Sequence, residues 1–288
     1  MDTEQQRRTA RAMWHLLEPI HAVTYFSDEI TMAYKSLGLK GFWQGYFASR
    51  VAPMGPVSGE VCTAVFYNFH PDMVQRALPS AWSLASPEAV LRARDEAILP
   101  VLATLLSAED SIAEAAELAT LVLEGCAVNG RALFAGHRTL PVPEDPILHL
   151  WWAATLLREH RGDGHVAALL ANGIDGVEAH VLFVGSGRVT RELMQGARSW
   201  SDEEWDDAVR RLAVRGLVEG GQLTGSGREL RDRIEAVTDD LAAEPWHRIG
   251  ERRTEHLARL LAPLRDCVIR AGRIPIDNPI GLPLGEPA

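Results

Sequence analysis

The sequence predicts a mainly α-helical protein, with a helical N-terminal region followed by a C-terminal winged helix-turn-helix domain. Apolar residues recur at helical spacing along most of the chain, as they do between Met13 and Ile20. Between Ser201 and Arg233, a capped helix precedes two short apolar runs joined by Gly220-Gly221, and a second capped helix follows. A glycine pair favours a tight turn between two strands. This segment therefore predicts a helix, a two-stranded wing and the helix after it.

The overall composition is typical of a soluble globular protein. The chain has 288 residues, 47% hydrophobic and 24% charged, which suits two domains of ordinary size or one large domain. Its formal net charge of -10 disfavours nonspecific attraction to nucleic acid or to an anionic membrane. No apolar run approaches the ~20 residues that span a bilayer, and residues 1–11 lack the apolar core of a signal peptide. We therefore expect a cytoplasmic protein with no membrane partner.

Cysteine usage and the known catalytic motifs argue against a metal or cofactor. Cys62, Cys126 and Cys267 are odd in number and far apart, which is typical of free thiols in a reducing compartment. None lies in a CxxC pair, and the chain has no HExxH motif. Gly185-Ser186-Gly187 is too short for a phosphate-binding loop and lacks its lysine, and no Gly-x-Ser-x-Gly elbow is present. We therefore expect no metal and no cofactor.

Prolines, glycines and capping residues punctuate the first hundred residues. Pro19 is expected to bend or end the first helix, and Pro100 to kink a later one. Residues 52–59 contain two prolines and two glycines, which predicts a loop. Residues 61–69 are apolar and partly β-branched, so they fit either a short strand or a buried helix. Ser86-Pro87 places a capping residue before a first-turn proline and predicts a helix start.

Further along the chain, helix starts are marked by capping signatures. Residues 107–110 resemble a capping box for a helix that ends near Gly125. Asp145-Pro146 is expected to start a helix that stops at Gly162. Three more capping boxes are predicted, pairing Asp175 with Glu178, Ser201 with Glu204, and Ser226 with Glu229. The helix after Ser226 is expected to bury a stripe formed by Leu230, Ile234, Val237 and Leu241.

Three prolines between residues 141 and 146 mark the predicted domain boundary. We expect an aromatic-rich helical domain at residues 1–140 and a winged-helix domain at residues 146–245. A C-terminal helix at residues 246–274 and a proline-rich tail at residues 275–288 follow, and the tail is expected to be extended on the surface or partly loose.

The predicted wing region resembles a known regulator family. Arg210–Val218, followed by Leu223–Arg228, resembles the recognition helix and wing of MarR-type regulators, in which Gly-Leu-Val ends the helix and Leu-Thr-x-x-Gly follows the wing. MarR-like modules are usually dimers. The resemblance therefore implies a homodimer, with contacts from the helix after Ser226 and from residues 254–264.

The longer chain resembles an actinobacterial family of winged-helix proteins of unassigned function. Its basic charge comes almost wholly from arginine, with only Lys35 and Lys40 as lysines, which is the usage of a GC-rich genome. The family landmarks lie at residues 21–26, 41–56 and 156–169.

The charges of the predicted recognition helix argue against DNA binding. A recognition helix contacts bases mainly through its N-terminal residues, and here those positions hold five carboxylates. They belong to Asp202, Glu203, Glu204, Asp206 and Asp207. From Arg188 to Ala243 there are nine arginines against twelve acidic residues, and the wing tip at residues 219–222 has no cation. We therefore expect this winged helix to serve as a packing module rather than as a DNA reader.

The densest polar cluster is Arg158–His165, which is predicted to lie between two helices. One interpretation is structural, because Arg158, His160 and Arg161 complement a helix dipole and Asp163 caps the next helix. The other is functional, with the two arginines holding an anionic or strongly polar ligand and a histidine donating a proton. Both interpretations stay open at this point.

A second cluster is aromatic. Eleven of the 19 aromatic residues, including all four tyrosines, lie between Tyr25 and Trp82. His21 and Tyr25 are one helical turn apart, and Phe42, Tyr46 and Arg50 share one helical face. An ordinary core explains such a cluster. So does a ligand pocket with apolar walls and a few polar groups.

Together these clusters predict a small-molecule-binding protein whose winged helix has been diverted from DNA. The ligand is expected between the aromatic region and residues 158–165, with polar contacts from Arg50, Arg158, Arg161 and Asp163 and walls from Tyr25, Trp43 and Tyr46. One alternative is a metal-independent enzyme of specialised metabolism, with His21, His160 or His165 as acid or base. Another is a ligand-responsive MarR-like transcriptional regulator, which requires the acidic helix to be hidden or its charge offset.

Overall fold

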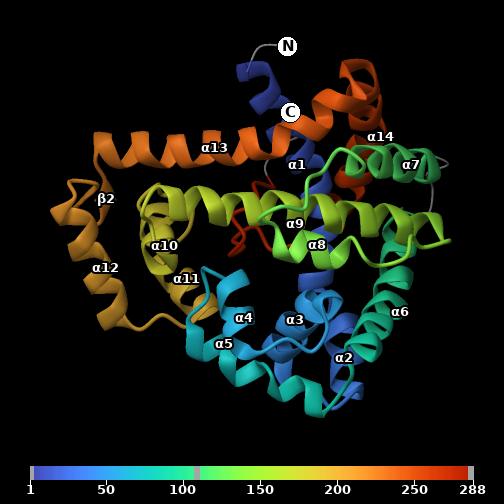
Figure 1. The fold of residues 1–288 in the computed structure, drawn as a ribbon, viewed down its shortest axis with the longest axis horizontal. Helices are drawn as coiled ribbons and strands as arrows, with labels where there is room; N and C mark the ends of the chain where they lie inside the picture. The colour runs from blue at the N-terminus through green and yellow to red at the C-terminus, as the bar shows by residue number, and fades with distance from the viewer. Residues whose placement is uncertain (1–2, 107–110, 285–288) are drawn as a thin grey trace.

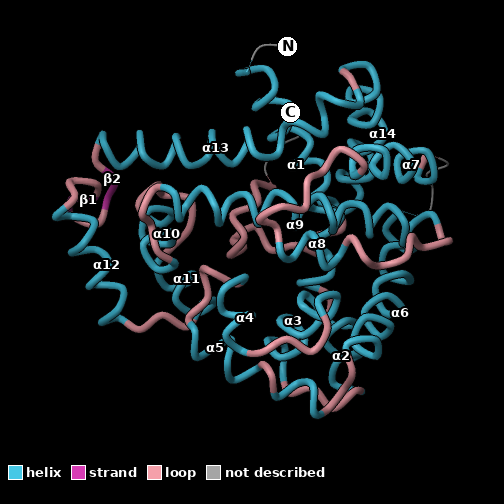
Figure 2. The backbone as a smooth tube through the Cα atoms, viewed as in Figure 1, coloured by secondary structure: helices cyan, strands magenta, loops and turns pink. Residues whose placement is uncertain are grey.

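The computed structural model describes residues 3–106 and 111–284, and the regular secondary structure of this part of the chain is almost entirely helical (Figures 1 and 2). The prediction of a mainly α-helical fold is confirmed. In chain order the helices are α1 (Thr3–Phe26), α2 (Asp28–Ser36), α3 (Gly41–Val51), α4 (Gly59–Val65), α5 (Pro71–Ala77), α6 (Pro87–Leu106), α7 (Ile112–Leu123), α8 (Ala132–His137), α9 (Pro146–Ala171), α10 (Gly176–Val184), α11 (Arg191–Arg198), α12 (Asp202–Val214), α13 (Gly225–Ile249) and α14 (Glu251–Arg270). The other regular elements are two 3-10 helices, Ala52–Met54 and Ser80–Ser83, and the strands β1 (Val218–Glu219) and β2 (Gln222–Leu223).

Two long helices, α9 and α13, lie side by side, and each extends from one half of the molecule into the other (Figure 1). Their ends belong to two separate apolar cores. The larger core contains α9 up to Leu157 and α13 from Ala242 onward, packed with α1 to α8 and α14. The smaller core contains α9 from Ala168 and α13 up to Ile234, packed with α10, α11, α12 and the hairpin.

Between the two cores, both long helices carry polar side chains. We call residues 158–165 of α9 and residues 235–239 of α13 the polar belt. Neither core cluster takes a buried apolar side chain from these two segments. The belt therefore places charged groups inside the molecule, at the level where the helical part meets the winged helix.

Helix α9 continues through the belt, so the prediction that it stops at Gly162 was wrong. Gly164 allows a close approach of other groups, since a Cβ there would lie 2.7 Å from Nη1 of Arg131 and 3.3 Å from Cβ of Leu241. The expected cap at Asp163 is also wrong, because this carboxylate accepts a hydrogen bond from the Phe134 backbone N–H in α8, at 3.0 Å. The glycines and charges that indicate a turn in the sequence instead mark helix packing.

The winged-helix elements are present as expected. The capping boxes of α10 at Asp175 and of α12 at Ser201 are both formed. Strands β1 and β2 pair antiparallel around Gly220 and Gly221, which adopt positive φ angles of 56° and 80°. The predicted cap of the next helix was wrong by two residues, because the Thr224 side chain accepts from a backbone N–H at the start of α13.

Several predictions for the N-terminal half concern where helices start, bend or end. Pro19 and Pro100 lie inside α1 and α6, so neither proline ends its helix. Of the two alternatives for residues 61–69, the helix is present, as α4 and the turn after it. Ser86 accepts a hydrogen bond from the Ala89 backbone N–H, and α6 starts as predicted. The capping box expected at residues 107–110 lies outside the described residues.

No single helix of the described residues is long and apolar enough to cross a membrane. Helices α9 and α10 pass such a test only as a pair, and a bend of 96° separates them.

The apolar faces of α13 and α14 are buried within one chain. Leu230 and Ile234 belong to the smaller core, and Leu257, Leu261 and Leu264 belong to the larger one. Leu241, expected in the buried stripe, is instead 38% exposed. These faces are therefore not free for the predicted dimer contact, and the homodimer stays a prediction.

Residues 271–284, which follow α14, pack against the body of the protein. The Asn278 side chain holds a turn there through hydrogen bonds with the backbone of Pro275, Ile276 and Leu282. Gly281 has a φ of 67°, and a Cβ at this position would lie 2.3 Å from the Phe183 ring. This close approach brings residues 279–281 against the winged helix.

Candidate functional site

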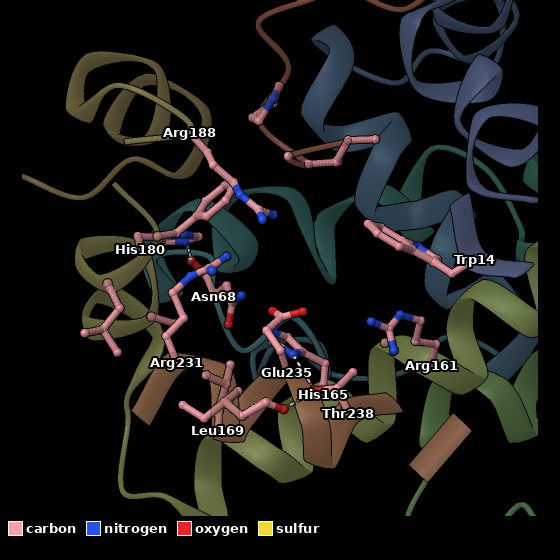
Figure 3. Close-up of a pocket in the computed structure, with 18 of the residues that line it drawn as sticks. Trp14, Asn68, Arg161, His165, Leu169, His180, Arg188, Arg231, Glu235 and Thr238 are labelled. Atoms are coloured by element: carbon pink, nitrogen blue, oxygen red, sulfur yellow. Dashed lines mark hydrogen bonds between the residues drawn. The ribbon is translucent and has the colours of Figure 1, made fainter. Parts of the chain in front are cut away.

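A cavity of about 280 Å³ lies at the polar belt, between the two cores (Figure 3). Its walls come from α1, α9, α10, α11 and α13, from the loop at Asn68, and from residues 279–281. Apolar side chains such as Trp14, Leu169 and Phe183 form part of the lining. Among the described residues, six arginines also line it, namely Arg11, Arg158, Arg161, Arg188, Arg198 and Arg231.

Three of these arginines have carboxylate partners. Arg11 contacts Glu235 and Asp239, each at 2.7 Å. Arg161 forms an ion pair with the other oxygen of Asp239 at 2.9 Å. Arg158 lies 2.9 Å from Glu159 and 3.7 Å from Glu18. The charges of this side of the cavity are therefore largely balanced by the protein.

Arg198 is a buried cation without a carboxylate partner in the described part of the chain. Its side chain donates to the backbone carbonyls of Ala197 and Pro279, at 3.1 and 3.0 Å, and its Nε–H has no acceptor. The residue is 8% exposed, and its guanidinium lies 4.4 Å from the Phe69 ring centroid. Burial lowers the pKa of Arg198 to about 10. Burying a charge without an ionic partner is unfavourable by several kcal/mol, so this arginine favours an anion beside it.

Arg188 and Arg231 also form no ion pair within residues 3–106 and 111–284, although the charges of Glu235 and Asp232 act on Arg231. Arg231 is half-buried, with its guanidinium 5.7 Å from the Phe183 ring centroid, and burial lowers its pKa. Arg188 is exposed, at the rim of the cavity. Figure 3 shows these two arginines on one side of the cavity, with Trp14 and Arg161 on the other. The cavity therefore has one end with excess positive charge.

The cavity also presents two neutral hydrogen-bond acceptors. The Thr238 hydroxyl donates to the Ile234 carbonyl at 2.7 Å, so it accepts from Nδ1–H of His165 at 3.0 Å. Nε2 of His165 is thus an acceptor, and burial lowers the pKa of this histidine, which keeps it neutral. Oδ1 of Asn68 is buried and has no donor among the described residues. An unsatisfied buried acceptor costs about 1–3 kcal/mol.

Asn68 is held in place through its backbone. Its carbonyl accepts from Nε2 of His180 at 2.8 Å and from Nε1 of Trp200 at 3.1 Å. Burial and the nearby Arg198 lower the pKa of His180 to about 3, so this ring stays neutral. The side-chain amide is therefore positioned at the cavity while its own oxygen is left without a partner.

The predicted polar cluster divides between the two sides of α9. Arg158, Arg161 and His165 are spaced at i, i+3 and i+7, so they share one face, and all three line the cavity. His160 and Asp163 lie on the other side of the helix. His160 packs against the Phe134 ring, 5.0 Å between centroids, and burial lowers its pKa to about 3. The interpretation that the whole segment converges as a turn is corrected by the continuous helix.

The predicted aromatic walls do not line this cavity. Trp43 and Tyr46 pack in the core against rings such as those of Phe47 and Phe69. Tyr25 contacts Tyr46, 5.0 Å between ring centroids. These three residues are thus part of the larger core, and they do not surround the cavity.

His21 and Arg50 belong to polar contacts buried in that core. His21 is 2% exposed, and both ring nitrogens are satisfied, by Thr155 and Tyr25, each at 2.9 Å. Arg50 forms two hydrogen bonds with Glu159, at 3.0 and 2.8 Å. Burial opposes ionisation of Glu159, but the charges of Arg158 and Arg50 outweigh it and hold its pKa well below its usual range.

The residues that sequence reasoning missed come from separate elements. Asn68 follows α4, Arg198 ends α11, and Arg231 lies in α13. The one signal in the sequence is that several arginines occur in an otherwise acidic stretch. Their spacing gives no indication that they face one cavity.

A family model described as a helix-turn-helix family matches residues 10–275. The chain belongs to this helix-turn-helix family. The match extends over both cores, so the helical part and the winged helix are matched together. Neither the search of curated proteins nor that of solved structures found a match. The MarR-type resemblance and the actinobacterial origin stay predictions.

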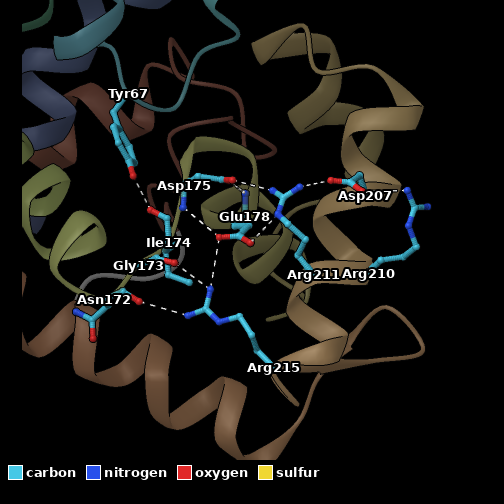
Figure 4. A network of polar contacts seen from close by, with 10 residues as sticks. All are labelled: Tyr67, Asn172, Gly173, Ile174, Asp175, Glu178, Asp207, Arg210, Arg211 and Arg215. Carbon is cyan, nitrogen blue, oxygen red and sulfur yellow. Dashed lines mark hydrogen bonds and ion pairs between the residues drawn. The ribbon is translucent and has the colours of Figure 1, made fainter.

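In this helix-turn-helix protein, α12 is the helix that the sequence predicts as the recognition helix. Arg210, Arg211 and Arg215, toward its C-terminal end, are bound within the chain (Figure 4). Arg211 contacts Asp175 at 2.7 Å, Glu178 at 3.2 Å, and Asp207. Arg215 donates to the Gly173 and Asn172 carbonyls and lies 3.6 Å from Glu178, and Arg210 pairs with Asp207 at 3.1 Å.

Carboxylates in the first half of α12 are also paired with an arginine of the same chain. Arg191 of α11 contacts Asp202 at 2.8 Å and Asp206 at 2.7 Å. A group that neutralises a carboxylate of its own chain is not free to neutralise a phosphate. These arginines therefore fasten the helix-turn-helix to itself and to α10, and they add no net positive charge to its outer face.

Among the described residues, no group of three or more His, Cys, Asp or Glu side chains is arranged to hold a metal ion.

Proposed function

We propose that this helix-turn-helix protein binds a small anionic molecule in the cavity at the polar belt. The observation that carries the proposal is the set of three guanidinium groups, Arg188, Arg198 and Arg231, that line one cavity and form no ion pair among the described residues. A chain with a net charge of -10 has enough carboxylates to pair every arginine. A bound anion offsets the unfavourable burial of the unpaired charge.

A substitution at Arg198 tests whether the cavity binds anions. Inorganic phosphate and 3-phenylpropionate, titrated at constant ionic strength, should raise the melting temperature of the wild type, because a ligand that binds only the native state stabilises it. Replacing Arg198→Gln should weaken this binding about 10- to 100-fold, since a hydrogen bond to a charged group contributes about 1.5–3 kcal/mol. The matched control is Arg210→Gln, which lies on α12 and away from the cavity.

Two results would count against an anion site. One is a wild type that no anion stabilises, and the other is an Arg198→Gln variant that responds like Arg210→Gln. Native mass spectrometry of the purified protein provides a second measurement, because a retained compound identifies the ligand and the same spectrum tests the proposed homodimer.

We propose further that the winged helix is a packing module rather than a DNA reader. Its first turn is acidic, and the arginines of α12 are paired within the chain. Wild-type protein should therefore show no salt-dependent shift of random duplex DNA at low ionic strength. Replacing Glu203→Lys and Glu219→Lys, two exposed residues without an ion pair in the described residues, should increase DNA binding relative to wild type. A salt-dependent shift by the wild type would favour the alternative of a ligand-responsive regulator.

An enzyme remains the second candidate, and one observation favours it. Of the three predicted histidines, His165 lines the cavity, and its Nε2 is free to accept a proton. If His165→Ala abolishes turnover of a retained compound and leaves its affinity intact, the binding-only proposal is wrong. His160→Ala is the matched control, because this ring lies on the other side of α9.

A further inference from the structure

We infer that the ligand is an organic acid with an apolar body and a hydroxyl group next to its anionic group, as in a 2-hydroxy acid. The inference rests on the proposed function and adds the class of ligand. It follows from the position of three kinds of group around the cavity: unpaired cations, an unpaired neutral acceptor, and apolar side chains.

The anionic group belongs beside Arg198. This side chain is 8% exposed, and its Nε–H has no acceptor in the described residues, whereas its other hydrogen bonds go to the carbonyls of Ala197 and Pro279. Arg231 lines the same cavity and forms no ion pair among those residues. A carboxylate has the charge and the acceptor atoms that these guanidinium groups lack.

The hydroxyl group follows from Asn68, which borders the same end. The next residue is Phe69, whose ring lies under the Arg198 guanidinium at 4.4 Å, and the His70 N–H donates to the Arg198 carbonyl at 3.1 Å. Oδ1 of Asn68 is buried and, in the described part of the chain, without a donor. A carboxylate cannot satisfy it, because an ionised carboxylate has no hydrogen to donate. We therefore expect the ligand to carry a donor close to its anion, and the adjacent cations favour a neutral hydroxyl over an ammonium group.

The rest of the ligand is expected to be apolar and small. Trp14, Leu169 and Phe183 line the cavity, and the volume of about 280 Å³ is at the small end of ligand sites. His165 offers a second acceptor at Nε2, for a further donor of the ligand or for water. A polymer or a large cofactor does not match these dimensions.

The test compares three probes that differ in one group each. Isothermal titration at constant ionic strength uses 3-phenyllactate, 3-phenylpropionate, which lacks the hydroxyl, and 3-phenyllactamide, which lacks the charge. Wild type should bind 3-phenyllactate about tenfold more tightly than 3-phenylpropionate, and the amide should bind at least tenfold more weakly than the hydroxy acid. In Asn68→Leu, the two acids should bind equally.

The variant also has a readout that a purely structural asparagine would not give. Because Asn68→Leu removes an unsatisfied buried acceptor, its melting temperature without ligand should equal or exceed that of wild type. If Asn68→Leu does not fold, Asn68→Ala is measured in its place, and the two acids should again bind equally.

Each outcome separates the ligand class from the binding proposal. If both acids bind wild type equally, or if the hydroxyl preference persists in Asn68→Leu, the inference is wrong and the anion site stands. The same holds if phosphate binds and neither acid does. If no anion binds at all, both the inference and the proposed function are wrong.

Discussion

Replacing Glu159→Gln is expected to destabilise the protein by about 3–5 kcal/mol, the range found when one partner of a buried ion pair is removed. Glu159 is 1% exposed and neutralises both Arg50 and Arg158. When Glu159 loses its charge, Arg158 still has the Glu18 carboxylate at 3.7 Å. Arg50, in contrast, retains a hydrogen bond with the neutral Tyr46 hydroxyl. The variant therefore leaves a buried cation without a carboxylate, behind the wall of the cavity.

Urea denaturation measures this effect as a change in the free energy of unfolding. Glu203→Gln is the control, because this carboxylate is exposed and has no ion pair among the described residues, and its variant should change stability by less than about 0.5 kcal/mol. Equal stability of the two variants would contradict the role assigned to Glu159.

The effect should also depend on pH. The folded-state pKa of Glu159 is depressed, so its charge contributes stability above the unfolded pKa of about 4.3, and this contribution is lost as the pH falls through the folded-state value. The difference between wild type and Glu159→Gln should therefore be constant from neutral pH to about pH 5 and should shrink below about pH 4. An undiminished difference at about pH 3 would show that the loss is not electrostatic.

Replacing Gly176→Ala is expected to destabilise the protein by about 3 kcal/mol, at the upper end of the range for overpacking. Gly176 begins α10, and a Cβ there would lie 2.3 Å from the Tyr67 carbonyl oxygen. The obstacle is backbone rather than a flexible side chain, and the Tyr67 hydroxyl also donates to the Ile174 carbonyl at 2.6 Å. The chain must therefore shift where the helical part meets the winged helix.

The matched control is Gly196→Ala, inside α11. A Cβ at Gly196 meets no atom within 4 Å, and the residue has ordinary helical φ. Alanine there should stabilise the protein by about 0.5–1 kcal/mol, because glycine is the poorer helix former. Thermal melts of the two variants should shift in opposite directions. Because Asn68 follows Tyr67, Gly176→Ala should also weaken anion binding, and unchanged binding would separate this loop from the site.

Local chemistry made much of the winged helix predictable. A capping box depends on two residues three positions apart, so Asp175 with Glu178 and Ser201 with Glu204 are visible in the sequence and are formed in the structure. The same applies to the hairpin at Gly220 and Gly221, where a tight turn requires positive φ angles. Such features involve neighbours along the chain and need no knowledge of the fold.

The same local reasoning failed where a residue acts over long range. Gly162 and Gly164, among charged residues, indicate a turn by every local rule, yet α9 runs through both, and Arg131 and α13 pack closely against it at Gly164. Asp163 has the chemistry of a cap and is used as one, but for the first turn of α8 rather than for the helix that follows it. A polar segment in the middle of a buried helix has no local signature that separates it from a loop.

The sequence by itself determined the helical class, the wing and the excess of carboxylates on α12, because each follows from periodicity, capping chemistry or charge along one segment. Only the tertiary structure decided which arginines have partners. Arg161, Arg211 and Arg215 are neutralised by residues of other elements, and Arg198 is not. Ion pairing depends on distances of a few ångströms between elements far apart in the chain. For that reason the candidate site lies at the polar belt rather than in the aromatic cluster.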